Sequence, residues 1–209
     1  MFDIIQKGGA VMYPIILCSV IALAIVIERI SYFYRIKIDS AAFMNNIEGA
    51  LKYNKIAEAV KICEDTPGPT ARVIKAGILK YDRPRQEIRE AIEDAGHQEI
   101  PGLEKHIKTL AAIAHISPLL GILGTVIGMI KVFNIIQLKA AASNPVGTLD
   151  LAGGVWTALL TTAAGLIVAI PTITAYHYLA SRVQDFTIEM ERSAAELINI
   201  LSQRIEGYK

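Results

Sequence analysis

Three long apolar stretches stand out from an otherwise charged chain. They cover roughly positions 12–30, 110–130 and 151–179, and the second and third contain no Asp, Glu, Lys or Arg. A helix needs about 20 apolar residues to cross the hydrocarbon core of a bilayer, and each stretch is long enough. The pattern therefore predicts an all-α membrane protein with three transmembrane helices.

The segment between the first two stretches also has helical spacing. One helix is expected over Ala42–Glu64, ended by the Pro67-Gly68-Pro69 run, and a short helix over Thr70–Lys80 follows it. Pro84 is expected to begin the next helix, because a proline in the first turn loses no hydrogen bond. The expected inward positions of the three helices are Phe43, Ile47, Leu51, Ile56 and Val60, then Val73, Ile74, Ile78 and Leu79, then Ile88, Ala91, Ile92 and Ala95.

Two further features concern the ends of the membrane segments. Pro101 interrupts the run that leads into the second stretch, where a proline is expected to kink or restart the helix. After Arg182 a charged helix is expected to continue to about Ile205. Its apolar stripe, which needs a partner to pack against, consists of Val183, Phe186, Met190, Leu197 and Leu201. The sequence thus predicts long helices that leave the membrane and continue beyond it.

Basic residues indicate the orientation of the chain. They gather at the ends of the stretches that face the connector and the C-terminus, at Arg29, Arg35, Lys37, Lys105, Lys108 and Arg182. The positive-inside rule places these ends in the cytoplasm. The expected parts are an outward-facing N-terminal segment over 1–11, transmembrane helix 1 over 12–34, a cytoplasmic helical connector over 35–108, transmembrane helix 2 over 109–135, a periplasmic loop over 136–150, transmembrane helix 3 over 151–180, and a cytoplasmic C-terminal helix over 181–209.

Hydroxyl side chains are the first candidates for chemistry in the membrane. Thr157, Thr161 and Thr162 cluster in the third stretch, and Ser117 and Thr125 lie in the second. Hydroxyls both donate and accept hydrogen bonds, so they can hold water or relay a proton without a buried charge. The alternative is that each hydroxyl bonds to a carbonyl of its own helix and has no further role.

Small residues and prolines accompany these hydroxyls. Small residues let membrane helices approach closely, and Gly124 and Gly128 form one Gly-x-x-x-Gly step. Prolines within a span free a carbonyl and bend the helix. The residues expected to serve packing or kinking are Pro118, Gly121, Gly124, Gly128, Gly165 and Pro171.

Other classes of function find little support. The chain has no Walker A, dinucleotide-binding, Gly-x-Ser-x-Gly, Cys-x-x-Cys or His-Glu-x-x-His motif, and its four histidines lack metal-ligand spacing. We therefore predict no enzyme, no catalytic residue, no cofactor and no metal site. A net charge of +1 without a dense basic run argues against a nucleic-acid partner. Cys18 and Cys63, expected in different layers, are predicted to be free thiols.

The expected spans also lack an acid. No Asp or Glu lies in the core of any of them, although a proton pathway normally needs a carboxylate there. His115, near the inner end of the second stretch, is interpreted as an interfacial or packing residue. If the chain conducts protons, the titrating carboxylate is therefore expected on another subunit.

The membrane segments resemble a known family. Ser117-Pro-Leu-Leu-Gly-Ile-Leu-Gly-Thr-Val-Ile-Gly-Met-Ile130 and Ala158-Leu-Leu-Thr-Thr-Ala-Ala-Gly-Leu-Ile-Val-Ala-Ile-Pro171 resemble the second- and third-helix motifs of the ExbB/TolQ/MotA proton-channel family. Pro67-Gly-Pro-Thr-Ala-Arg-Val-Ile-Lys-Ala-Gly77 resembles a cytoplasmic segment of ExbB-like members. MotA proper is larger with four spans, so ExbB and TolQ are the more similar branch.

The resemblance implies an assembly and a role. Family members form a homo-oligomeric ring, a pentamer, in the bacterial inner membrane around a dimer of ExbD- or TolR-like single-span partners. The partner's membrane helix carries the proton-binding aspartate, and Thr125 and Thr162 match the two family threonines that face it. The assembly uses the proton-motive force to drive TonB-dependent uptake or Tol–Pal envelope maintenance, through a TonB- or TolA-like protein.

One position departs from the family pattern, and two alternatives remain. Many ExbB sequences carry a glutamate where this chain has Thr157.

A passive helical scaffold for a single-span partner would leave the threonines without a role. A secondary transporter or solute channel is disfavoured by three spans, no inverted repeat and no charged substrate site. Threonine-lined sites suit either protons or sodium ions, and the resemblance favours protons.

Overall fold

The computed structural model describes residues 8–142, 145 and 147–206, and every regular element in that part of the chain is an α-helix. Three helices among the described residues are long and apolar enough to cross a membrane. The all-α expectation and the three membrane-spanning stretches are thereby confirmed. The N-terminal segment predicted over 1–11 and the turn around Asn144 fall largely outside the described residues.

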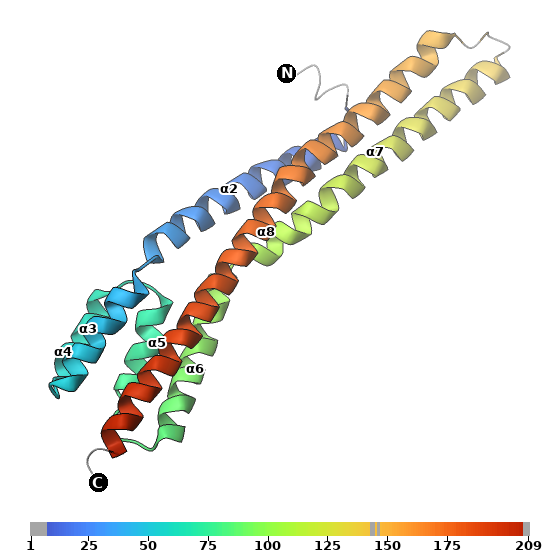
Figure 1. Ribbon diagram of the computed structural model, residues 1–209. Helices are drawn as coiled ribbons and strands as arrows, with labels where there is room; N and C mark the ends of the chain where they lie inside the picture. The colour runs from blue at the N-terminus through green and yellow to red at the C-terminus, as the bar shows by residue number, and fades with distance from the viewer. Residues whose placement is uncertain (1–7, 143–144, 146, 207–209) are drawn as a thin grey trace. The chain divides into compact units, whose positions relative to one another are not determined.

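The chain divides into two compact units (Figure 1). The first unit contains residues 1–27 and 106–178, and the second contains residues 28–105 and 179–209. Helix α2 (Met12–Ile36) and helix α8 (Thr148–Glu206, 59 residues) each contribute to both units. The predicted continuation of the third span into a charged helix is therefore one uninterrupted element.

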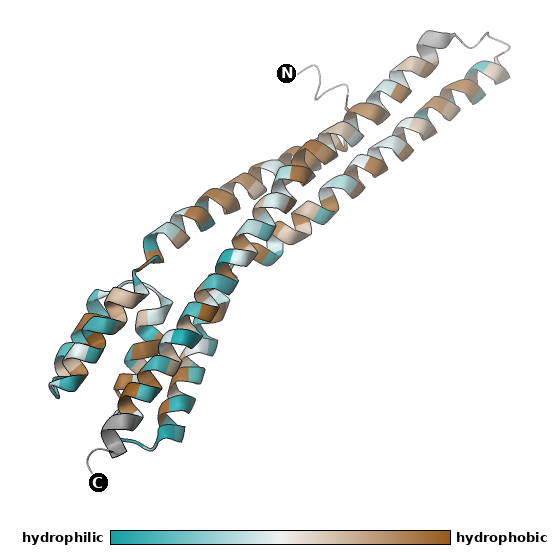
Figure 2. Cartoon of the chain, in the orientation of Figure 1, coloured by the Kyte–Doolittle hydropathy of each residue, from teal (hydrophilic) through white to brown (hydrophobic). Residues whose placement is uncertain are grey.

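The first unit consists of the N-terminal part of α2, helix α7 (Ile107–Ala141) and the N-terminal part of α8. Large apolar side chains cover its outside, and Leu119, Phe133 and Ile167 are 62%, 59% and 71% exposed. A helix that is apolar on all sides is either buried in protein or surrounded by lipid. In Figure 2 brown turns predominate along these helices, with paler turns between them. The outer surface of this unit is therefore suited to lipid or to other membrane helices.

The second unit has an ordinary protein core. It contains helices α3 (Ser40–Lys52), α4 (Ile56–Asp65), α5 (Pro69–Ile78) and α6 (Arg85–Leu103), together with the charged end of α8. Each of these helices alternates hydrophilic and hydrophobic residues (Figure 2), as expected for one apolar stripe per helix. The largest fully buried side chains include Ile47, Leu51, Ile74, Ile78, Ile88, Leu103, Leu197 and Leu201.

The apolar stripe predicted at the end of α8 is buried in this core. Val183, Phe186, Met190, Leu197 and Leu201 are all at most 9% exposed. The rings of Phe33 and Phe186 lie 5.6 Å apart between centroids, so the C-terminal end of α2 packs against α8. A Cβ on Gly77 would lie 2.8 Å from Leu197 Cδ2, which shows how closely α5 approaches α8. The apolar stripe of α8 therefore packs against other helices of the same chain, among them α2 and α5.

The single helix predicted over Ala42–Glu64 is wrong, because α3 ends at Lys52 and α4 begins at Ile56. Asn54 has φ 62° in the left-handed region, which Asn tolerates better than most residues. The N–H of Lys55 donates to Ala50 O at 3.0 Å, and the N–H of Asn54 donates to Leu51 O at 3.1 Å. These two bonds form a Schellman motif, which satisfies the last carbonyls of α3 and turns the chain.

Two smaller expectations also need correction. Pro101 does not restart a helix, because it lies within α6, which ends at Leu103, and a kink at this position stays a prediction. The break follows at His106, which has φ 63° and immediately precedes α7. Leu79, predicted to point inward, is 58% exposed because it is the C-cap of α5 rather than part of its buried face.

Candidate functional site

The predicted small residues of the second span face the third span. Ser117, Gly121, Gly124 and Gly128 lie on one face of α7, at spacings of three and four residues, and all are buried. The neighbouring atoms at each of these glycines belong to α8. Figure 1 shows the two helices side by side. We call this contact the α7–α8 interface.

Backbones approach closely along the α7–α8 interface. A Cβ built on Gly165 would lie 2.6 Å from Ser117 O and 3.1 Å from Gly121 Cα. A Cβ on Gly128 would lie 2.9 Å from Gly154 O. A Cβ on Gly124 would overlap the side chain of Thr161. Because a methyl group would collide at each position, only glycine permits this separation of the helices.

Residues that the sequence analysis did not single out extend the interface. A Cβ on Gly154 would overlap Val132 Cγ2 and would lie 3.1 Å from Gly128 O. Ala158, 4% exposed, packs at Gly128. The missed signal was a second stripe of small residues at helical spacing, formed by Gly154, Ala158, Thr161 and Gly165.

One hydroxyl bonds across the α7–α8 interface. Thr162 Oγ1 donates to Gly121 O at 3.1 Å. A carbonyl has no proton to give, so the hydroxyl must be the donor. Gly121 also precedes Thr125 by four residues within α7, so the same carbonyl accepts the backbone N–H of Thr125 in the helical ladder. Gly121 O thus connects the two candidate threonines.

The other candidate hydroxyls bond to their own helices. Thr125 Oγ1 donates to Ile122 O at 2.6 Å, and Thr157 Oγ1 donates to Gly153 O at 3.0 Å. Thr161 Oγ1 lies 2.8 Å from Ala158 O, and Ser117 Oγ lies 2.8 Å from Ile113 O. This is the local bonding expected for hydroxyls in apolar helices.

Exposure separates the five hydroxyl residues into two groups. Ser117 and Thr161 are 0% exposed, so the helices of this chain enclose them completely. Thr125, Thr157 and Thr162 are half-buried and retain accessible surface. A pore-lining role stays a prediction for all five, but the second group already offers surface to a neighbouring molecule.

The two prolines sit differently on their helices. Pro118 is half-buried next to Ser117 inside α7, and Pro171 is exposed inside α8. Each lacks the N–H that would bond four residues back, so the carbonyls of Ala114 and Ile167 lose their ladder partner. Because of Pro118, the carbonyl of Ala114 lacks its helical N–H donor, and this carbonyl lies one turn before Ser117 of the α7–α8 interface.

The apolar stretches around these hydroxyls contain no acid. Residues 12–27 of α2, 107–141 of α7 and 151–178 of α8 include no Asp or Glu. Among the described residues, no group of three His, Cys, Asp or Glu side chains is placed to hold a metal ion. The polar groups described at the α7–α8 interface are hydroxyls and carbonyls, which can form hydrogen bonds.

A buried arginine lies near the C-terminal end of α2, in the second unit. Arg29 is 3% exposed, and its Nη1 donates to Gly102 O at 3.1 Å. Its Nε donates to Glu28 Oε2 at 2.7 Å, and its guanidinium lies 4.7 Å from the ring centroid of Tyr32. Because Gly102 is in the last turn of α6, Arg29 satisfies a terminal carbonyl and places positive charge at the helix C-terminus.

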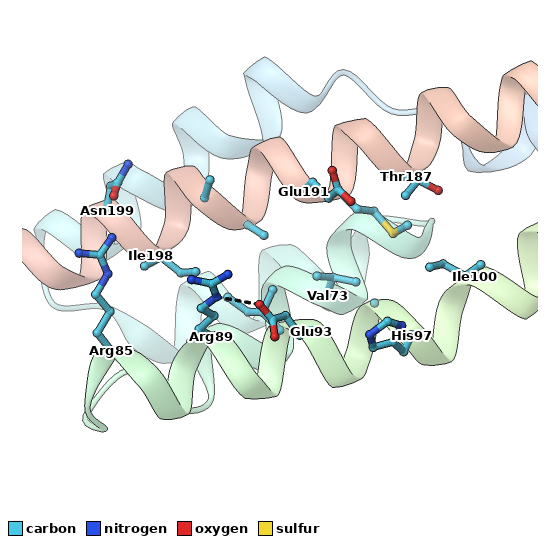
Figure 3. A pocket seen from close by; sticks show the side chains of 15 residues that line it. Val73, Arg85, Arg89, Glu93, His97, Ile100, Thr187, Glu191, Ile198 and Asn199 are labelled. Carbon is cyan, nitrogen blue, oxygen red and sulfur yellow. Dashed lines mark hydrogen bonds and ion pairs between the residues drawn. The ribbon is translucent and has the colours of Figure 1, made fainter.

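The second unit also contains a groove of about 520 Å³ between α5, α6 and α8 (Figure 3). Apolar side chains such as Ile92 and Met190 line it. Arg85 and Arg89 of α6 lie toward one end, where Arg89 Nε pairs with Glu93 Oε1 at 2.7 Å. The groove is therefore lined by both apolar and charged side chains.

Cys63 is buried in the second unit. Burial raises the pKa of its thiol to about 12, and nearby Lys75 only partly opposes this effect. Cys18 is half-buried, and neither thiol forms a disulfide. The prediction of two free thiols is confirmed.

Known proteins are similar in sequence to most of this chain. Residues 65–192 match the sequence profile described as the MotA/TolQ/ExbB proton channel family. The ExbB-like 1 protein of Synechocystis is 32% identical over 87% of this chain and 71% of its own length. The TolQ protein of Haemophilus influenzae is 27% identical over 98% and 95%, and the exbB1 biopolymer transport protein of Vibrio cholerae is 28% identical over 97% and 87%. The chain therefore belongs to the MotA/TolQ/ExbB proton channel family.

Proposed function

We propose that the chain is the ring-forming subunit of an inner-membrane motor complex driven by the proton-motive force, of the ExbB–ExbD or TolQ–TolR type. Copies of the chain assemble as a homo-oligomer, a pentamer, around an ExbD- or TolR-like single-span partner. The N-terminus is periplasmic and the C-terminus is cytoplasmic. The complex energises outer-membrane transport or envelope maintenance through a TonB- or TolA-like protein.

The observation that carries this proposal is a pair of half-buried hydroxyls in apolar stretches that contain no Asp or Glu. Thr125 and Thr162 retain accessible surface on either side of the carbonyl of Gly121. Polar groups inside a membrane are costly, and the two stretches that hold them contain no carboxylate of their own. In the proposed cycle the partner's aspartate is neutralised by a proton, passes the apolar part of the ring, and releases the proton near these hydroxyls.

Thr157, Thr161 and Ser117 have smaller parts in this proposal. Thr157 is half-buried and lies one turn before Thr161 on α8, so it is the third hydroxyl that a partner helix could meet. Ser117 and Thr161 are enclosed by α7 and α8, and we assign them to packing of the α7–α8 interface. Gly121, Gly124, Gly128 and Gly165 keep the two helices close, and Pro118 and Pro171 shape them.

The test combines assembly with proton flow. Native mass spectrometry of the chain in mild detergent, with its co-purifying single-span protein, should show a closed ring that holds a substoichiometric partner dimer. In energised vesicles, Thr162→Val should abolish proton-driven activity while the ring still assembles. Thr174→Val is the matched control, because Thr174 lies on α8, is exposed, and bonds to Ile170 O of its own helix at 2.9 Å.

A passive scaffold is the second candidate, and one observation favours it. The hydroxyls of Thr125, Thr157 and Thr161 all bond to carbonyls of their own helices, as silent threonines would. If Thr162→Val assembles normally and retains wild-type activity, the scaffold replaces the motor. A monomer or dimer that ignores the partner removes the motor as well.

A further inference from the structure

The groove of the second unit follows α6 and α8 for about four helical turns. Its lining residues on α6 extend from Arg85 to Ile100, and a separation of 15 residues (100 − 85) along a helix corresponds to about 22 Å. Its lining residues on α8 extend from Thr187 to Asn199. Figure 3 shows Arg85 and Asn199 toward one end, and Ile100 and Thr187 toward the other, so the two helices run antiparallel along the groove. A volume of about 520 Å³ is typical of ligand-binding sites in proteins.

The groove is apolar at its base and open at its wall. The buried residues that line it are all apolar and at most 8% exposed, namely Val73, Ile92, Met190 and Ala194. In the wall, a Cβ on Gly96 would meet nothing within 4 Å, and Gly96 does not have a left-handed backbone. Glycine weakens a helix relative to alanine, so neither packing within this chain nor backbone geometry explains Gly96. Its missing side chain leaves room for an occupant from outside the chain.

The groove carries charges of both signs. Arg85 and Arg89 come from α6, and Arg89 Nε pairs with Glu93 Oε1 at 2.7 Å. In the described part of the chain, neither Arg85 nor Glu191 has an ion-pair partner. Arg85 lies toward the end of the groove that Asn199 marks, whereas Glu191 of α8 lies farther along it (Figure 3). A complementary occupant therefore has an apolar face, an acid toward Arg85 and a base toward Glu191.

A second copy of the chain does not offer such a face in its second unit. Each large apolar side chain exposed among the described residues of that unit lies on a different helix or loop, at Tyr34, Tyr53, Leu79, Tyr81 and Ile188. No helix there presents an apolar stripe outward. An anionic lipid would complement Arg85 but not the carboxylate of Glu191. The groove therefore favours a peptide segment of another protein, which can supply an apolar face and both charges.

We propose that the groove binds an amphipathic segment of the single-span partner, on the side of the membrane where the second unit lies. A protein that crosses a bilayer once has a segment on each side of it. The uninterrupted helix α8 carries both Thr162, which we assign to the partner's membrane helix, and the groove residues from Thr187 to Asn199. A partner that leaves the membrane beside α8 can therefore follow the same helix to the groove. The inference rests on the proposed function and adds a second contact with the partner, outside the membrane.

The experiment places the photoreactive amino acid p-benzoylphenylalanine at Asn199, an exposed residue at one end of the groove. The full chain is purified with its co-purifying single-span protein and irradiated, and peptide mass spectrometry identifies the crosslinked segment. The single-span protein should be crosslinked through an amphipathic segment outside its membrane helix. The matched position is Asn46, which is exposed on α3 and does not line the groove, so the same substitution there should give no crosslink.

Two variants test the shape and the charge of the groove. Gly96→Leu should abolish the crosslink at Asn199, because the new side chain fills the groove while leucine favours helix over glycine. Gly49→Leu is the matched control, since a Cβ on Gly49 also meets nothing within 4 Å but Gly49 does not line the groove. Arg85→Glu should lower the crosslinked fraction roughly two- to fivefold, the effect of losing one exposed ion pair.

Each outcome decides a different point. A crosslink from Asn199 to the single-span protein that Gly96→Leu removes and Gly49→Leu retains supports the inference. A crosslink to a second copy of the chain overturns it in favour of an interface between copies, and a crosslinked lipid overturns it in favour of a lipid site. A co-purifying single-span protein that is not crosslinked, or is crosslinked equally in Gly96→Leu, overturns it and leaves the proposed function standing. If no single-span protein co-purifies, the proposed function fails first and the inference fails with it.

Discussion

Gly165 lies directly against the carbonyl oxygen of Ser117, and a Cβ at Gly165 would come within 2.6 Å of that oxygen. The obstacle is backbone rather than the flexible end of a side chain, so it cannot move aside without a shift of α7. Gly153 lies three turns away on the same helix, and a Cβ there would meet nothing within 4 Å. Gly165 is therefore required for close helix packing, whereas the packing of the chain does not require glycine at position 153.

Gly165→Ala should destabilise the folded chain in detergent by about 1–3 kcal/mol, because it overpacks a closely fitted contact. Gly153→Ala should be neutral or stabilising by up to about 1 kcal/mol, because alanine favours helix over glycine and has room here. Equilibrium unfolding in mixed micelles with increasing sodium dodecyl sulfate would measure both. Equal stability of the two variants would contradict the role assigned to the α7–α8 interface.

Arg29→Ala should destabilise the second unit by about 1–3 kcal/mol, since it leaves Gly102 O without its donor and removes a buried side chain. Arg29→Lys should recover only part of this loss, because lysine lacks the planar fork that reaches both Glu28 and Gly102. The control is Arg89→Ala, which removes an exposed ion pair with Glu93 and should leave the free energy of unfolding nearly unchanged. Thermal unfolding of the purified variants compares all three, and a loss in Arg89→Ala as large as in Arg29→Ala would refute the assignment.

Asn54→Gly should leave stability nearly unchanged, whereas Asn54→Val should lower it by roughly 1–2 kcal/mol. The reason is the left-handed backbone of Asn54 between α3 and α4, which glycine adopts freely and a β-branched residue does not. Chemical denaturation monitored by circular dichroism provides the measurement. Tolerance of valine at this position would mean that α3 and α4 join in the continuous helix that the apolar pattern predicts.

Cys63 should resist alkylation by iodoacetamide at pH 8.5 in the folded protein and react once the protein is unfolded in urea. Its pKa of about 12 leaves little thiolate, and thiolate is the nucleophile. The raised pKa also makes the free energy of unfolding depend on pH, because the folded state holds the thiol proton more tightly than the unfolded state. The contribution of Cys63 is present below about pH 9 and is lost as the pH rises toward about 12. Equal labelling of folded and unfolded protein, resolved by peptide mass spectrometry, would disprove this.

Much of the architecture can be predicted from the chain because it depends on local composition. A run of about twenty predominantly apolar, uncharged residues favours the hydrocarbon core of a bilayer, so spans at 110–130 and 151–179 can be predicted from their composition. Proline and glycine at Pro67-Gly68-Pro69 end a helix whatever surrounds them, and the stripe from Val183 to Leu201 must be buried because it is apolar on one face. The break at Asn54 was missed because the apolar pattern continues through a turn that one left-handed residue creates.

The hydrogen-bond partners of the threonines cannot be predicted from local composition. Thr161 and Thr162 are adjacent and chemically identical, yet Thr161 bonds to its own helix and Thr162 to Gly121 of α7. That choice depends on which face of α8 meets another backbone and on how closely it comes, which Gly121 and Gly165 determine together. The sequence by itself determined three apolar helices with hydroxyls inside them, because hydrophobicity and length are local quantities. Only the tertiary structure decided which hydroxyl crosses to the neighbouring helix, because a hydrogen bond needs two groups about 3 Å apart.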